Sequence, residues 1–178
     1  MTLEELKKEL LNLKDHIRSE QAKRLTTDKR VPLMAEIIAK KDEKEARAMI
    51  PIDSERRHET IEIAGREAHK FFDEVIAIIV VSECWFSKQP KDQKEYIQPS
   101  KDPERQEVLM ISGMTREGIT DCKMFELGKN GELLNESADF AGKSKDDEPI
   151  RFESPLLAKF WPKPANYIRP DFRKEFTA

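Results

Sequence analysis

Glycine, cysteine and histidine are all scarce in this chain. It holds 6 glycines, 2 cysteines and 3 histidines among 178 residues. So few glycines leave few backbone amides with which to cradle a nucleotide phosphate, and the phosphate-loop, CxxC, HExxH and GxSxG motifs are all absent. The sequence therefore offers no recognised catalytic motif, and we expect neither a cofactor nor a bound metal.

The two cysteines, Cys84 and Cys122, fall in predicted strands and form no closely spaced pair. We expect both to be reduced thiols, with a disulfide between them as the less favoured alternative. Cys84 has no neighbouring base in the sequence and no family signature around it. A role for Cys84 as a nucleophile is therefore not favoured.

Long hydrophobic runs and an excess of one charge are also missing. The longest apolar run, residues 75–81, is far shorter than the roughly 20 residues that cross a bilayer. The N-terminus, MTLEELKKELLNLK, alternates charge with leucine and lacks the apolar segment of a signal peptide. The net charge of −3 argues against a general nucleic-acid binder. We expect a cytoplasmic protein without membrane or nucleic-acid contacts.

Apolar residues make up 38% of the sequence and are gathered in patches, and charged residues make up another 38%. This balance and the length indicate one well-solvated domain with a core of its own. We expect a single α+β domain over residues 1–178, with an N-terminal helix in 1–28, a core in 29–141 and an irregular C-terminal arm in 142–178. The core is expected to hold an antiparallel sheet of five or six strands, with two helices packed mainly on one face.

A first helix is predicted over residues 3–25. Thr2 is a suitable N-cap, and apolar residues recur at three- and four-residue spacing at Leu3, Leu6, Leu10, Leu13 and Ile17. Such a stripe packs either on the domain's own sheet or on a second copy of the chain. The domain's own sheet is the favoured interpretation, because single amphipathic helices usually cover it.

A β-hairpin is predicted next. Residues 30–40 and 45–52 flank the charged turn 41–44. Alanine and glutamate are weak strand formers, so a helix over residues 34–49 is the competing interpretation. Pro32 and Pro51 bracket the segment, and if it forms strands they indicate an edge position or a strand end.

A second helix, capped by Asp53 or Ser54, is predicted to run to about Phe72. His58, Glu62 and His69 lie in one sector beside its apolar stripe. The two imidazoles are about 16 Å apart along the helix axis, which is too far to share one ion. Ordinary helix-surface neighbours are therefore favoured over a metal site.

The strongest strand signals are two apolar segments, residues 75–86 and 106–113, joined by a long polar connector over 87–105. The first reads VIAIIVVSECWF and is apolar on both faces up to Ser82, so it is expected at the centre of the sheet, covered on both sides for most of its length. Strands over residues 119–127 and 132–140, with an Asn-Gly turn between them, would complete a meander.

The C-terminal arm mixes aromatic residues with Pro155, Pro162, Pro164 and Pro170. So much proline excludes a long regular element, although residues 155–161 suit a short helix with proline at its first position. Docking of the arm on its own domain or on a sister subunit is favoured over an exposed recognition segment, because large exposed apolar patches are rare.

Candidate site residues gather where the two apolar segments meet the connector: Glu83, Trp85, Asp102, Arg105 and Glu107. A half-buried carboxylate at Glu83 needs a cationic or hydrogen-bonding partner, and Arg105 is the natural candidate if the strands are antiparallel neighbours. The favoured interpretation is a salt bridge that anchors the connector. The alternative is a carboxylate–arginine site beneath a proline-stiffened lid.

The same residues carry a resemblance. The string SECWFS, a variable polar loop and then PSKDPERQEVLMISG resemble a pattern in uncharacterised bacterial proteins, in which a Glu-x-Trp strand end is followed by a Pro-rich loop and a Pro-x-Arg-Gln-Glu strand start. The resemblance spans about residues 75–125. It departs at Cys84, where a small residue is expected, and at Asp102, where histidine is expected. It implies an α+β domain and no activity.

The function expected from the sequence is a non-enzymatic accessory or protein-interaction module that self-associates. The absence of catalytic motifs, the leucine-striped first helix and the aromatic arm favour it. Its expected partner is a second copy or another protein. The alternative is a hydrolase acting at Glu83, Arg105 and Glu107, with or without a divalent cation.

Overall fold

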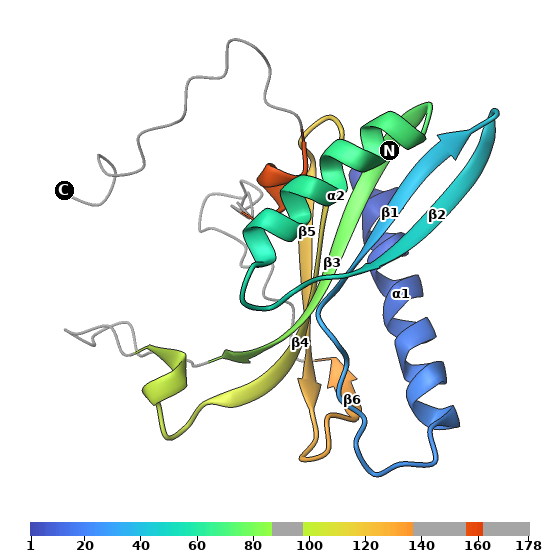
Figure 1. Cartoon of the computed structure of the whole chain (residues 1–178). Helices are drawn as coiled ribbons and strands as arrows, with labels where there is room; N and C mark the ends of the chain where they lie inside the picture. Colours follow the sequence, from blue (N-terminus) through green and yellow to red (C-terminus); the bar gives the residue numbers. More distant parts are fainter. Residues whose placement is uncertain (87–97, 137–155, 162–178) are drawn as a thin grey trace, which may run out of the picture.

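The computed structural model describes residues 1–86, 98–136 and 156–161. These residues form two α-helices, six strands and two short 3₁₀ turns (Figure 1): α1 (Leu3–Lys23), β1 (Met34–Lys41), β2 (Lys44–Pro51), α2 (Arg57–Phe71), β3 (Glu74–Phe86), η1 (Pro99–Lys101), β4 (Gln106–Thr115), β5 (Thr120–Leu127), β6 (Leu133–Glu136) and η2 (Leu157–Lys159). The predicted α+β class is confirmed.

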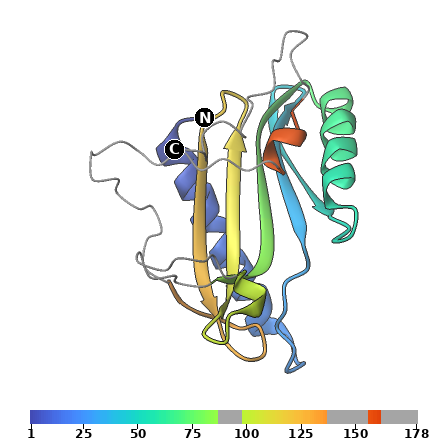
Figure 2. The ribbon, with the colours of Figure 1, turned by 90° about the vertical axis from the view of Figure 1, so that its left-hand side faces the viewer.

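The strands form one antiparallel sheet in the order β2-β1-β3-β4-β5-β6. The sheet curls into a half-barrel (Figure 2). β3 is central, as its apolar faces predict, and β3 to β6 form the predicted meander as far as Glu136. The predicted continuation of the last strand to residue 140 lies outside the described residues. The connection from β2 to β3 runs through α2 and crosses β1, which leaves β2 at the edge of the sheet.

The predicted hairpin is confirmed over the competing helix. β1 and β2 pair from Met34↔Pro51 to Lys41↔Lys44 and leave a two-residue turn. Both turn residues, Asp42 and Glu43, have positive φ (50° and 62°). Two positive φ angles give this turn the twist that fits the flanking strands, and here aspartate and glutamate adopt them where asparagine and glycine are usual.

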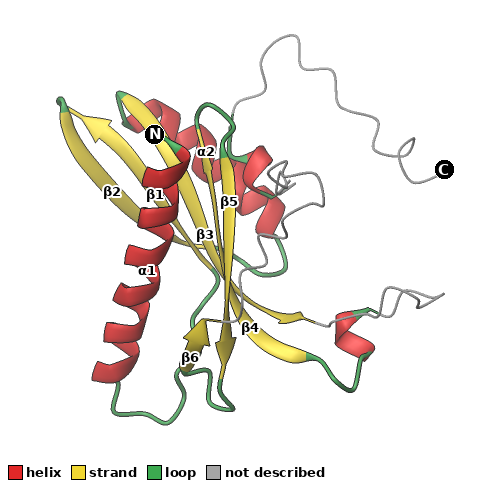
Figure 3. Cartoon of the chain, turned by 180° about the vertical axis from the view of Figure 1, so that it is seen from behind, coloured by secondary structure: helices red, strands yellow, loops and turns green. Residues whose placement is uncertain are grey.

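The helices lie on opposite faces of the sheet, which corrects the expectation that both cover mainly one face. On one face α1 packs against β4 and β5 (Figure 3), and its core includes Leu6, Leu10, Ile79 and Ile111. On the other face α2 and η2 pack over a second core that includes Ile37, Ile61, Ile78, Leu157 and Phe160. The physical reason is in β3 itself: a strand that is apolar on both faces needs cover on both.

The α1 stripe is buried on the domain's own sheet, as favoured. Leu6 and Leu10 are 0% exposed. Thr2 caps the helix in a capping box with Glu5, as expected for the N-cap. At the other end the buried amide of Gln21 donates to the carbonyls of Lys29 (2.7 Å) and Gly131 (2.8 Å) and accepts from the N–H of Leu133 (3.1 Å). This side chain therefore ties the end of α1 to the turn between β5 and β6. Neither described helix is long and apolar enough to cross a membrane.

The second helix begins later than predicted. Its N-cap is Arg56, without a side-chain cap, because Asp53 instead accepts the N–H groups of Glu55 (2.9 Å) and Arg56 (3.3 Å) in the turn before it.

Gly65 of α2 lies directly against the backbone of Phe160 in η2. A Cβ atom on Gly65 would stand 1.9 Å from the Phe160 carbonyl oxygen. The predicted short helix of residues 155–161 appears as η2, and docking is confirmed for residues 156–161, since Leu157 is 0% and Phe160 1% exposed. The rest of the predicted arm lies outside the described residues.

Candidate functional site

The predicted corner at the ends of β3 and β4 is built around a cation that the sequence did not indicate. Arg30 Nη1 lies 3.0 Å from Glu107 and 3.4 Å from Glu83. The N–H of Val31 also donates to Glu83 at 2.6 Å. Glu83 is thus paired through the segment before β1 and not through Arg105, so that predicted pairing is wrong. The register shows why: β3 lies between β1 and β4, and the chain entering β1 passes its end.

The other three predicted residues form a second group. The Arg105 guanidinium lies 4.8 Å from the centre of the Trp85 ring and donates to the Ser100 carbonyl at 3.1 Å. The Asp102 side chain accepts the N–H of Glu104 at 2.8 Å, and its carbonyl accepts the N–H of Arg105 at 3.2 Å. A cation over an aromatic ring contributes about 0.5–1 kcal/mol at an exposed site. These contacts hold the chain where it returns to β4.

The chemistry of this corner is that of an ion-pair anchor. Its two carboxylates share one guanidinium, and Glu83 also accepts a backbone N–H, which is how half-buried charges are normally satisfied. Among residues 1–86, 98–136 and 156–161, no three histidine, cysteine, aspartate or glutamate side chains gather closely enough to hold a metal ion. The anchoring interpretation is therefore the one these contacts support.

His69 packs beside two aromatic rings, with ring centres 5.9 Å from Phe160 and 5.5 Å from Trp161. Burial, with a smaller contribution from nearby Arg116, lowers the pKa of His69, so the neutral imidazole is favoured. His69 is therefore not the ordinary helix-surface neighbour that the sequence predicted, because its ring packs against Phe160 and Trp161.

The two thiols are free and half-buried. Burial raises the pKa of Cys84, and burial, with smaller effects of Asp121 and Cys84, raises the pKa of Cys122 to about 12. Both remain protonated at neutral pH and are poor nucleophiles, because the thiolate is the reactive form.

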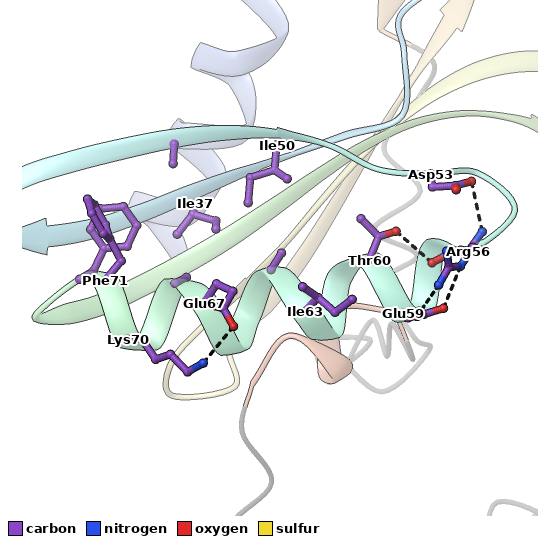
Figure 4. Close-up of a pocket in the computed structure, with 14 residues that line it drawn as sticks. Ile37, Ile50, Asp53, Arg56, Glu59, Thr60, Ile63, Glu67, Lys70 and Phe71 are labelled. Atoms are coloured by element: carbon purple, nitrogen blue, oxygen red, sulfur yellow. Dashed lines mark hydrogen bonds and ion pairs between the residues drawn. The ribbon is translucent and has the colours of Figure 1, made fainter.

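A second feature, which the sequence analysis missed, is a groove between α2 and the β1–β2 hairpin (Figure 4). This α2 groove has a volume of about 750 Å³. Its lining is mainly apolar, with charged residues at the rim: Ile37, Ala48, Ile50, Asp53, Arg56, Glu59, Thr60, Ile63, Ala64, Glu67, Ala68, Lys70, Phe71 and Phe72. Glu59, Ile63, Glu67 and Phe71 recur at four-residue spacing along α2, which could have indicated the groove, but an exposed apolar residue alone is ordinary.

Two large apolar side chains in the wall of the α2 groove are open to water. Ile63 is 42% exposed and Phe71 61%. Four of the charged residues at the rim are paired, Arg56 with Glu59 (2.9 Å) and Lys70 with Glu67 (3.0 Å), and the Asp53 carboxylate accepts backbone N–H groups. Because these ions are neutralised within α2, the groove presents apolar surface with little net charge.

The β2 edge borders the same groove. β2 pairs with β1 on one side only, and no other described strand pairs with its outer side. Its Met49 side chain is 48% exposed. An open apolar groove and an unpaired strand edge therefore lie together at one end of the sheet. No family model, no curated protein and no solved structure matches the chain.

Proposed function

We propose that this protein is a non-enzymatic accessory or interaction module of the cytoplasm that associates with itself, and that the α2 groove holds a segment of a protein partner. The observation that carries the proposal is the open apolar groove with Ile63 and Phe71 in its wall, directly beside the unpaired β2 edge. Peptides and subunits commonly bind where apolar surface stays exposed beside a strand edge.

The energetics favour an apolar occupant. Covering a large aliphatic or aromatic side chain completely stabilises a complex by about 1.5–3 kcal/mol. Ile63 and Phe71 each retain a large part of that surface. The internally paired rim adds orientation and little attraction, because exposed ion pairs contribute at most about 1 kcal/mol.

Self-association was expected through the leucine stripe of α1, and we now attribute it to the β2 edge. The leucine stripe of α1 is buried on the domain's own sheet and offers nothing to a second copy. The β2 edge takes its place, since an unpaired edge presents N–H and C=O groups that another strand can bond. The hydrolase alternative gains no comparable support, because the carboxylates at its centre are held by Arg30 and Val31.

A selection experiment tests the groove. A display library of random 12-residue peptides is panned against the full chain, and selected peptides are measured against Ile63→Asp and Leu25→Asp. We expect enriched peptides to carry apolar residues and to lose at least tenfold in affinity on Ile63→Asp. Leu25 is fully exposed outside the groove, so its variant should bind as the parent does.

Self-association is tested separately by light scattering over a concentration series. A mass that rises toward twice 20.7 kDa supports it. A constant monomer mass up to millimolar concentration contradicts it, and peptides that bind both variants alike contradict the role of the groove.

A further inference from the structure

The β2 edge has a definite pattern of outward-facing backbone groups. In an antiparallel pair, hydrogen-bonded and non-hydrogen-bonded residue pairs alternate. The two-residue turn makes Lys41↔Lys44 a hydrogen-bonded pair, and the N–H of Ile52 donates to the Leu33 carbonyl at 2.9 Å, in step with that alternation. The residues between them that turn their N–H and C=O groups away from β1 are therefore Glu45, Arg47, Met49 and Pro51.

Proline at the end of this series fits the pattern. Pro51 has no N–H, and its nitrogen faces outward, where β1 requires no donor. The outward donors are thus confined to Glu45, Arg47 and Met49, a short and defined stretch.

We propose that β2 pairs with β2 of a second copy in antiparallel fashion, with the two-fold axis at Ala48, so that the two sheets become one and the two α2 grooves share a floor. This inference deepens the proposed function, since it names the partner at the β2 edge as a second copy and specifies the register.

Hydrogen bonding allows only registers that place outward-facing residues of the two copies opposite each other. Side-chain chemistry selects one of these registers. A two-fold axis at Arg47 would place two guanidinium groups directly opposite each other, which is destabilising. An axis at Ala46 uses only the half of the strand next to the turn. An axis at Met49 leaves residues 44–46 without a partner in β2. An axis at Ala48 pairs Arg47 with Met49 of the second copy and Ala46 with its Ile50, and it engages residues 45–51. The exposed Met49 side chain is then covered by the aliphatic part of Arg47.

The charge of Arg47 is already satisfied within its own chain. Its guanidinium lies 2.9 Å from Glu9, 3.3 Å from Glu36 and 2.8 Å from Glu45. The side chain can therefore lie beside an apolar neighbour without leaving an unpaired ion at the interface.

The second copy also completes the α2 groove. Ala48 and Ile50 lie on the α2 side of β2, opposite Ile37 and Ala35 of β1. Across the proposed axis Ala48 meets its own counterpart and Ile50 meets Ala46 of the second copy, so the apolar floor continues from one α2 to the other. A partner segment would then lie on a floor to which both copies contribute.

Cross-linking tests the register. In a Cys84→Ser, Cys122→Ser background, Ala48→Cys is compared with Ala46→Cys under mild oxidation. The axis at Ala48 places the two residues 48 directly opposite, at a non-hydrogen-bonded pair with Cα atoms about 4.5 Å apart, which suits a disulfide. The two residues 46 would be about 14 Å apart along the strands. We expect a covalent dimer from Ala48→Cys and little from Ala46→Cys; the opposite preference would overturn the proposed register.

A second variant tests the edge itself. Met49→Pro removes an N–H that β1 does not use, two residues before a proline that β2 already tolerates. Met49→Ala is the matched control, because it shortens the side chain and retains the N–H. We expect Met49→Pro to weaken dimerisation about 30-fold, from two lost hydrogen bonds, with the circular dichroism spectrum unchanged. Met49→Ala should weaken it less.

The outcomes separate the two proposals. A wild-type dimer that Met49→Pro leaves intact would refute pairing through β2 while self-association stands. A chain that stays monomeric would refute both β2 pairing and self-association. If the α2 groove of that monomer still selects peptides, the partner-binding part of the proposed function would stand alone.

Discussion

Replacing Gly65 by alanine should destabilise the fold, although alanine is the better helix former. In an exposed helix interior this change would stabilise by about 1 kcal/mol. Here the new Cβ would stand 1.9 Å from the Phe160 carbonyl oxygen. Backbone on both sides leaves no flexible side chain to move aside, so η2 has to shift away from α2.

The magnitude follows from what η2 buries. Leu157 and Phe160 are 0% and 1% exposed, and covering each contributes about 1.5–3 kcal/mol. Part of the loss is offset by the helix propensity of alanine and by conformational freedom that the released residues regain. We expect Gly65→Ala to lower the free energy of unfolding by about 2–4 kcal/mol.

Urea denaturation followed by circular dichroism measures this change, with Glu62→Ala on the exposed side of α2 as the control. A double-mutant cycle that combines Gly65→Ala with Phe160→Ala identifies the cause of the lost stability. If η2 already packs poorly, Gly65→Ala should cost much less in that background. A neutral or stabilising Gly65→Ala, or the same cost in both backgrounds, would refute the packing argument.

Three further predictions concern charge and thiol chemistry. Arg30→Met should lower the midpoint of urea denaturation, because two carboxylates lose their shared cation, whereas Arg105→Met should lower it less; equal losses would contradict the assignment of the shared cation. The pKa of His69 is lower in the folded state than the ordinary 6.5, so stability should be unaffected above that pH and fall as the pH drops through 6.5 toward the folded-state value. His69→Gln should flatten that pH dependence in thermal melts and His58→Gln should not. With its pKa raised to about 12, the Cys122 thiol should react with iodoacetamide at pH 8 much more slowly in the folded protein than in urea, and equal rates would show that it is not shielded.

Most helices and strands of the fold could be predicted from local sequence patterns. Local periodicity predicts both the type of an element and its buried face. This holds for the alternation along residues 119–127, the leucine spacing of α1 and the apolar run of β3. The placement of α2 was less accessible, because nothing in its own stripe says which side of the sheet it covers. That side is set by the crossover from β2 to β3, a property of the whole chain.

At the candidate corner, too, local sequence patterns located the residues but not their partner. Antiparallel pairing of the two strands suggested Arg105 as the partner of Glu83, since Arg105 lies where the connector returns to the sheet. The actual partner, Arg30, stands 53 residues before Glu83 and arrives only because β1 pairs beside β3. The α2 groove escaped notice for a related reason: its wall and floor come from separate elements, and each of its residues alone looks like ordinary surface.

The bonds of Gln21 bear on how this protein is made. Its side chain bonds Gly131 and Leu133, 110 and 112 residues further along the chain. During synthesis α1 emerges first, yet the strands it covers, β4 and β5, emerge last among the long strands. Contacts of such sequence separation form slowly. Until those strands have been made, the leucine stripe has only part of its cover and is open to chaperones and to neighbouring nascent chains. The bonds of Gln21 form only when the β5–β6 turn is complete.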